Sequence, residues 1–352
     1  MTENKLKELF ELYGYRKYRM NRFETYDFYS ENKNFLKTSN LITFTDLDGR
    51  LMAMKPDITL SIMRNAGSED EKVYYMDTVY RAGDSHYREV AQAGVERIGQ
   101  IDDYAEAEVI SMAVRALECI SSDYSLRVSD SDFVSSLLDE LNIDEPLQKE
   151  ILSLFSRKNC DGLKKLSSEN RISGEICSVL TDVLDIYLPI KEGIEKIRGM
   201  EFGEKIQKTV EHMSKVCEIL DSFGVLDKIY LDFSMAAGMT YYSGVIFRGA
   251  VPEVPFNILS GGRYDTLPQK MGKDSGAIGF ALDLDLIENY MKTEKEYDYD
   301  VILVYTDKTD KKKLASMQTE MMGKGKTVFC VREETYEKVK ERIKAKETIC
   351  VK

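Results

Sequence analysis

The chain has 352 residues, of which 43% are hydrophobic and 31% charged, as in an ordinary globular protein of two or three domains. No apolar window reaches the roughly eighteen residues of a membrane span, and the charged amphipathic start lacks the apolar core of a secretory signal, so we expect a cytoplasmic protein with no membrane partner. The formal net charge of −12 argues against tRNA or other nucleic acid as a partner, because phosphate binding needs a basic surface.

Cysteine and histidine usage argues against metal chemistry. The six cysteines are scattered without a CxxC pair, and the two histidines, His86 and His212, lie far apart in the sequence. A zinc site needs clustered soft ligands. We therefore expect no metal site and no cofactor, and we interpret the cysteines as buried reduced thiols.

The first hundred residues predict one helix followed mainly by strands. Apolar residues at helical spacing over 3–13 indicate an opening amphipathic helix. Period-two alternation on both sides of Asp48-Gly49 predicts a β-hairpin. Helical periodicity restarts over 59–66, with Thr59 as its cap. Residues 71–99 indicate two strands joined by a short loop.

The middle of the chain changes from strands to helices. Residues 102–120 predict a strongly amphipathic helix. Almost continuous helical periodicity over 131–222 predicts a helical insertion, about 131–200, and a long return helix. Strands resume near 228, and residues 275–291 predict a strand that runs into a helix.

The predicted organisation is a core over 1–290, a charged linker over 291–298, and a small, truncated α/β unit over 299–352. In the core, strands precede and follow the helical insertion and lack the regular strand–helix alternation of a parallel sheet. We therefore assign the core to the α+β class with a mainly antiparallel sheet.

Polar residues that suit a small zwitterion gather in four stretches. Asp57 follows a proline in MKPDIT, and strand alternation places Arg88, Gln92 and Glu96 on one face, with Gly94 leaving space between them. Tyrosines and glycines follow in AGMTYYSG and SGGRYD. Together these groups could form a pocket with carboxylates for an amine, an amide for a polar side chain, and aromatic walls.

The order of these stretches resembles the catalytic domain of histidyl-tRNA synthetases, a class II synthetase fold. KPDIT stands where that family has RPEGT, and YRAGDSHYREVAQAGVE is similar to FRxERPQxGRYRQFHQxGVE. AGMTYYSGVIFR is similar to RGLDYYTGxVFE, SGGRYDTL to AGGRYDGL, and GFALDLDLI to GFAxGLERL. The resemblance covers roughly residues 1–290 and implies an antiparallel sheet flanked by helices.

Departures from the family pattern fall on the groups that handle ATP. Ala237 stands where the family's histidine motif has arginine, and Thr240 replaces the aspartate after it. The closing Glu-Arg reads Asp285-Leu286, so Arg81 alone remains of three expected arginines, and the second-motif loop is about three residues shorter. Losing one such electrostatic group typically costs about 10²–10³ in rate, so we expect little aminoacylation.

The amino-acid side of the pocket keeps its groups, and this combination resembles the regulatory subunit of ATP phosphoribosyltransferase. That resemblance implies a non-catalytic protein, active in histidine biosynthesis, which assembles with the short catalytic phosphoribosyltransferase and carries histidine feedback. It also implies a homodimer within a hetero-oligomer, formed through roughly residues 10–35. The histidine-binding residues that it implies are Asp57, Thr59, Arg81, Gln92, Glu96, Tyr241 and Tyr242.

Two alternatives stay open at this point. One is a divergent histidyl-tRNA synthetase or an amino-acid ligase that forms adenylates. The other is a histidine sensor that acts alone, without a phosphoribosyltransferase partner.

Overall fold

The computed structural model describes residues 2–36, 41–67, 70–83, 86–236, 242–291 and 297–351. It divides into two compact units, Met1–Met291 and Lys292–Lys352, each described below by itself. None of the helices in the described part is long and apolar enough to cross a membrane.

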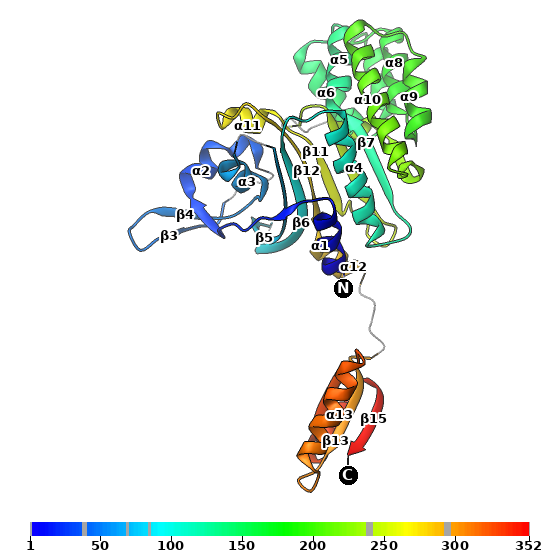
Figure 1. Ribbon diagram of the computed structural model, residues 1–352. Helices are drawn as coiled ribbons and strands as arrows, with labels where there is room; N and C mark the ends of the chain where they lie inside the picture. The colour runs from blue at the N-terminus through cyan, green and yellow to red at the C-terminus, as the bar shows by residue number, and fades with distance from the viewer. Residues whose placement is uncertain are drawn as a thin grey trace. The chain divides into compact units, whose positions relative to one another are not determined.

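A large sheet forms the centre of the first unit (Figure 1). Its strands, in spatial order, are β1 (Arg16–Lys17), β5 (Glu71–Ala82), β6 (Tyr87–Gly99), β12 (Gly276–Asp283), β11 (Leu259–Arg263), β10 (Val245–Ala250), β7 (Ser125–Asp130), β9 (Ile229–Leu231) and β8 (Leu188–Pro189). Neighbours pair antiparallel except β1 with β5 and β7 with β9. The mainly antiparallel sheet and the α+β class are confirmed.

A small second sheet contains the predicted hairpin. Its strands are β2 (Phe23–Thr25), β4 (Leu51–Met54) and β3 (Thr43–Thr45), all antiparallel. Gly49 in the turn has a φ of +84°, a left-handed conformation that glycine adopts without strain. Next to this sheet lie α2 (Tyr26–Glu31), η1 (Lys33–Phe35) and α3 (Thr59–Asn65).

One face of the large sheet is covered by α1 (Thr2–Leu12) and α4 (Asp103–Glu118) (Figure 1). Alternate residues of the strands, such as Val95, Phe247 and Phe280, face these helices and form the main core. Because that face is apolar, the residues between them, including Gln92 and Glu96, face the other side. The short helices α11 (Thr266–Lys270) and α12 (Leu284–Tyr290) follow β11 and β12.

The predicted helical insertion lies between β7 and β9. Its helices are α5 (Ser131–Glu140), α6 (Glu145–Ser156), α7 (Cys160–Ser168), α8 (Gly174–Leu184), α9 (Ile190–Arg198) and the return helix α10 (Glu204–Ser222). The short turns η2 (Leu226–Lys228) and η3 (Phe233–Ala236) lie directly before and after β9. Helices α5 to α8 each have an N-cap residue whose side chain accepts a hydrogen bond from a backbone N–H in the first turn. These N-cap residues are Asp130, Asp144, Asn159 and Ser173. Such caps explain why the sequence signalled separate helices here.

The second unit is a three-stranded parallel sheet, ordered β14 (Val328–Arg332), β13 (Tyr299–Tyr305) and β15 (Ala345–Val351). Helices α13 (Lys311–Gly323) and α14 (Glu333–Lys340) supply the connections. Alternate residues of β13 contribute to two separate apolar clusters, because Val301 and Leu303 belong to one and Ile302 and Val304 to the other. Because β13 is buried on both faces, its residues 301–304 form a continuous apolar run, VILV.

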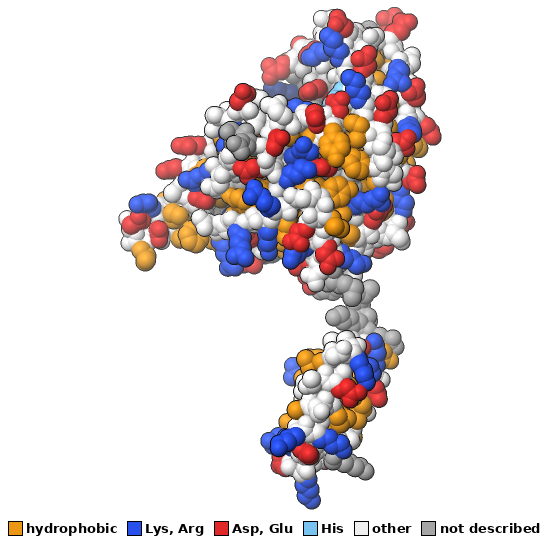
Figure 2. Space-filling model, in the orientation of Figure 1, with side chains coloured by type: hydrophobic (Ala, Val, Ile, Leu, Met, Phe, Trp, Pro, Cys, Tyr) orange, Lys and Arg blue, Asp and Glu red, His pale blue; other side chains and the backbone are white. Residues whose placement is uncertain are grey.

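Charged side chains of both signs are interspersed over the face drawn in Figure 2, and no continuous basic band shows on its described part.

Candidate functional site

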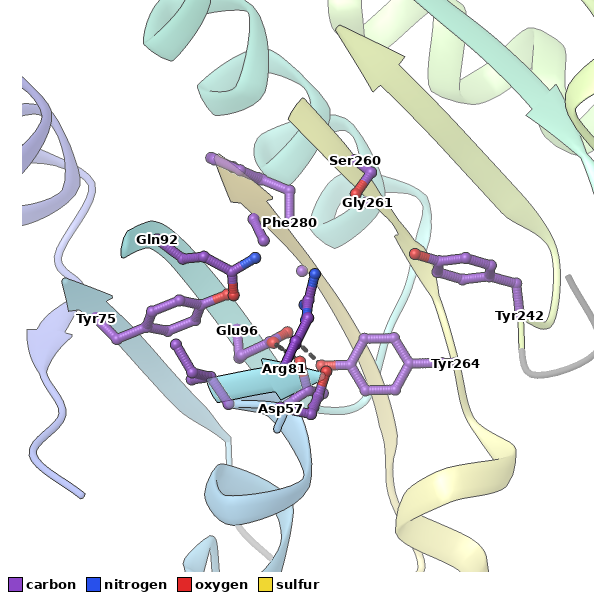
Figure 3. A pocket seen from close by; sticks show the side chains of 14 residues that line it. Asp57, Tyr75, Arg81, Gln92, Glu96, Tyr242, Ser260, Gly261, Tyr264 and Phe280 are labelled. Atoms are coloured by element: carbon purple, nitrogen blue, oxygen red, sulfur yellow. Dashed lines mark hydrogen bonds between the residues drawn. The ribbon is translucent and has the colours of Figure 1, made fainter. Parts of the chain in front are cut away.

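A pocket lies on the face of the large sheet opposite α1 and α4. It is bounded by the start of α3, by strands β5, β6, β11 and β12, and by Tyr242 just before β10 (Figure 3). The lining residues are Asp57, Ile58, Thr59, Tyr75, Arg81, Gln92, Glu96, Tyr242, Ser260, Gly261, Tyr264, Gly279, Phe280 and Ala281.

Strand β6 supplies the polar floor. Gln92 and Glu96 are only 7% and 2% exposed, and Gly94 lies between them on the same face. A Cβ on Gly94 would overlap the Tyr75 hydroxyl, which reaches across from the paired position on β5. Glycine is therefore required at this position because an aromatic side chain occupies the space above its backbone.

Glu96 is held on both carboxylate oxygens. Thr59 Oγ1 donates a hydrogen bond to Glu96 Oε1 over 2.6 Å, and the Tyr264 hydroxyl donates to Oε2 (Figure 3). Gly279, opposite Glu96 on β12, leaves room for that carboxylate, because a Cβ there would overlap Oε2. Three elements distant in sequence thus orient one buried acid.

The start of α3 brings a second acid to the pocket. Asp57 Oδ1 accepts a hydrogen bond from the Leu60 backbone N–H over 3.1 Å, three residues further on. The prediction that Thr59 caps this helix is wrong: the helix begins at Thr59, its N-cap is Ile58, and no side chain bonds at the cap position. The Thr59 hydroxyl instead serves Glu96.

The pocket carries a net negative charge on its β5–β6 side. Asp57 and Glu96 face a single cation, Arg81, whose Nε is buried without a hydrogen-bond partner among the described residues. Burial, followed by the charges of Glu96 and Asp57, raises the pKa of the Tyr75 hydroxyl well above its usual value. Such a surrounding favours a positively charged group in a ligand.

Of the two positions where this chain lacks an arginine of the resembling family, one, Leu286, lies in the described part of the chain. Leu286, in α12, packs against the main apolar core. Asp285 beside it accepts a hydrogen bond from the Ala91 backbone N–H over 3.1 Å. Ala237, Thr240 and Tyr241 lie outside the described residues.

The structure brings six of the seven predicted residues, Asp57, Thr59, Arg81, Gln92, Glu96 and Tyr242, to this one pocket. The seventh, Tyr241, falls outside the described residues. Sequence reasoning did not single out Tyr75, Tyr264 or Gly279. The SGGRYD stretch was noted, but which of its side chains meets Glu96 depends on the register of β11 with β12 and β6.

Comparisons with known proteins agree with one another. The sequence model of the histidyl-tRNA synthetase family matches residues 1–287. An ATP phosphoribosyltransferase regulatory subunit from Caldanaerobacter subterraneus subsp. tengcongensis is 31% identical over 295 residues, 81% of this chain and 76% of that protein. One from Clostridium kluyveri is 30% identical over 339 residues, 92% of this chain and 86% of that protein.

Solved structures share the fold. The ATP phosphoribosyltransferase regulatory subunit/histidyl-tRNA synthetase from Bacillus halodurans C aligns with a TM-score of 0.83 at 22% identity, over 99% of this chain and 93% of that one. The ATP phosphoribosyl transferase (HisG:HisZ) complex from Thermotoga maritima aligns with a TM-score of 0.64 at 19% identity, over 80% and 96%. The chain therefore belongs to the ATP phosphoribosyltransferase regulatory subunits, a family with the histidyl-tRNA synthetase fold.

Proposed function

We propose that this chain assembles with the catalytic subunit of ATP phosphoribosyltransferase, is required for that subunit's activity in histidine biosynthesis, and carries feedback by histidine bound in the pocket at Glu96. The chain itself is a non-catalytic subunit, in line with the relatives named as regulatory subunits. We place the assembly in the cytoplasm and assign it no tRNA.

One observation carries the proposal: the pocket keeps its acids while an arginine position of the synthetase pattern is filled by a core leucine. Glu96 is buried, is oriented by two hydroxyl donors and lines the same pocket as Asp57 and Gln92. Leu286 is partly buried and packs against the main apolar core. A pocket with groups that bind an amino acid, but without an arginine that the synthetase pattern uses for the ATP triphosphate, suits a sensor better than an adenylate-forming enzyme.

The proposed feedback is a shift between two assembly states. Histidine need only bind one state better than the other, and a coupling of about 1–3 kcal/mol is typical of such regulation. We further propose that two copies pair through roughly residues 10–35. Leu12 and Phe23 in that segment are 84% and 45% exposed, which supports an additional apolar contact there.

Reconstitution tests the proposal directly. The short catalytic subunit is assayed for phosphoribosyl transfer alone, with this chain, and with this chain plus histidine. We expect activity to appear only with this chain, to fall as histidine is added, and the two proteins to co-purify. A chain that binds histidine but neither co-purifies with nor activates the catalytic subunit would instead act as a sensor on its own.

The enzyme alternative has its own assay, because the matching family model is that of histidyl-tRNA synthetase. The chain is incubated with ATP, histidine and labelled pyrophosphate, with an authentic synthetase as positive control. We expect no exchange above background. Robust exchange would show that the remaining cations suffice for adenylate formation and would overturn the non-catalytic assignment.

A further inference from the structure

The pocket floor continues across the sheet toward two arginines. Residues paired across neighbouring strands share a face, and the pairing follows one row from Tyr75 on β5 through Gly94, Ala281 and Ser260 to Arg248 on β10. Each of the three residues between Tyr75 and Arg248 has a small side chain. Tyr75, Ala281 and Ser260 already line the pocket, so its floor ends beside Arg248.

Arg248 has a second guanidinium next to it. Arg127, the residue paired with it on β7, lies on the same face. Arg127 donates to Asn257 Oδ1 over 2.7 Å and contacts the fully buried Asp232 at 3.4 Å, and Lys158 contacts the same Asp232 oxygen at 3.2 Å. Two cations, Arg127 and Lys158, therefore share one carboxylate, and Arg248 is paired with Arg127 in the neighbouring strand, a local gathering of positive charge in a chain whose net charge is −12.

The environment of Arg248 favours a bound anion. Burial, and then the charge of Arg127, lowers the pKa of the half-buried Arg248 guanidinium, and an anion between the two arginines would relieve both effects. The Tyr242 ring, a wall of the pocket, is close enough to act electrostatically on Arg248. In the synthetase-like motif GxVFE, glutamate stands where this chain has Arg248, so the local charge is reversed.

We propose that Arg248, supported by Arg127, is an anion subsite at the β10 end of the pocket, and that it takes the α-carboxylate of the amino acid whose cationic end lies at Glu96 and Asp57. The inference rests on the proposed histidine-binding function and deepens it. Strands lie about 4.8 Å apart, so about 14 Å separate the backbones of β6 and β10. Side chains reaching in from both strands shorten that span to suit a compact zwitterion.

The experiment compares ligands that differ only in the anionic group. Calorimetric titration of the full chain measures affinities for histidine and for histidinol, in which a hydroxymethyl group replaces the carboxylate. Inorganic phosphate is added as a competitor to test a phosphate as the other source of the anion. The variants are Arg248→Gln, Arg248→Lys, which keeps the charge, and Arg171→Gln, a matched control in an exposed ion pair on the insertion.

We expect Arg248→Gln to weaken histidine binding by about tenfold to hundredfold, the weight of one charge-assisted hydrogen bond, and to change histidinol affinity by less than about twofold. Arg248→Lys should recover part of the loss, and Arg171→Gln should match the wild type. Equal loss for both ligands, or no loss for histidine, would overturn the subsite. If Arg248→Gln does not fold, Arg248→Lys tests the same claim. Its ratio of histidine affinity to histidinol affinity should then be lower than that of the wild type.

The phosphate arm separates the two sources of the anion. Competition by phosphate that is lost in Arg248→Gln, with histidine binding also weakened, supports an anion subsite that the amino acid uses. Phosphate binding that depends on Arg248 while histidine binding does not would overturn the carboxylate assignment. A wild-type chain that binds no histidine would instead refute the proposed function. The anion subsite would then be tested only by whether phosphate binding depends on Arg248.

Discussion

Glu96 receives hydrogen bonds from two hydroxyls, yet each carboxylate oxygen can accept a further one. A ligand amine or imidazolium can therefore bind without displacing Thr59 or Tyr264. We expect Glu96→Gln to weaken histidine binding by about tenfold to hundredfold, because a charge-assisted hydrogen bond contributes about 1.5–3 kcal/mol. Calorimetric titration measures this, with Glu89→Gln on the same strand as the exposed control. Unchanged affinity would place the cationic group elsewhere.

Gly279 shows how little space surrounds that acid. A methyl group there would overlap both the Glu96 carboxylate and the Val95 carbonyl oxygen. We expect Gly279→Ala to lower the free energy of unfolding by about 1–3 kcal/mol and to abolish histidine binding. Gly174→Ala is the matched control, since nothing lies within 4 Å of its added Cβ. Urea denaturation measures the free energy of unfolding of both variants. Equal values for Gly279→Ala and Gly174→Ala would contradict the prediction and would mean that β12 can shift to make room.

At this scale the sequence predicted the residues whose placement follows from local alternation. Gln92 and Glu96 lie four residues apart in β6, on the same face of the strand, and both line the pocket. Tyr75, Tyr264 and Gly279 depend on which residues pair across strands from distant parts of the chain. Period-two patterning states which face a residue is on but not which partner it meets.

Among the elements, α10 is joined to α4 by an ionic cluster. His212 contacts Asp103 at 2.9 Å and the buried Glu106 at 3.0 Å, and Arg263 of β11 contacts the other Glu106 oxygen at 2.8 Å. The insertion is thus tied to β11, the strand that Tyr264 directly follows. The hydrogen bond to Glu106 is the largest cause that raises the pKa of His212, to about 9.

This raised pKa predicts a pH-dependent stability. A histidine with a folded pKa near 9 and an unfolded value of 6.5 stabilises the fold fully below about pH 6.5, and the contribution is lost as pH rises through 9. After allowance for screening of this partly exposed group, we expect a loss of about 1–2 kcal/mol between pH 6 and 9.5. His212→Asn should flatten this part of the curve. Urea denaturation at several pH values measures it, and a parallel curve for His212→Asn would contradict the assignment.

Asp130 also makes the fold less stable as pH rises, but over a lower pH range than His212. Burial is the largest cause that raises its pKa to about 7, so its stabilising effect is lost as pH rises from about 3.8 through 7. Its side chain also caps α5 through the Phe133 N–H. In His212→Asn we therefore expect the decline below pH 7 to persist while the decline above it disappears, as the same denaturation series would show.

The elements themselves could largely be predicted, because strong periodicity and capping residues act locally. The hairpin and the insertion helices lie where the sequence placed them. The wrong prediction of Thr59 as a helix cap has a physical cause. A threonine hydroxyl can cap a helix, but here it donates a hydrogen bond to the buried Glu96 carboxylate, which is distant in the sequence.

For the whole molecule, the described pocket residues all come from positions 57–281 of the first unit. We propose that 1–290 folds as a domain of its own, joined by a linker over 291–298 to the α/β domain 299–352. A chain ending at Met291 should then bind histidine within about twofold of the full chain, because no described contact to the pocket is removed. Calorimetric titration tests this, and a tenfold loss would assign the second unit a part in binding.

The parallel pairing of β7 with β9 has a consequence for protein engineering. Parallel neighbours cannot be joined by a tight turn, so the chain must travel back along the sheet before entering the second strand. Helix α10, which ends shortly before β9, provides that return. Helices α6 to α8 could therefore be exchanged for a shorter bridge without breaking the topology, whereas excising α10 would leave β9 unable to dock. Amide hydrogen exchange on Ile229–Leu231 would distinguish the two deletions.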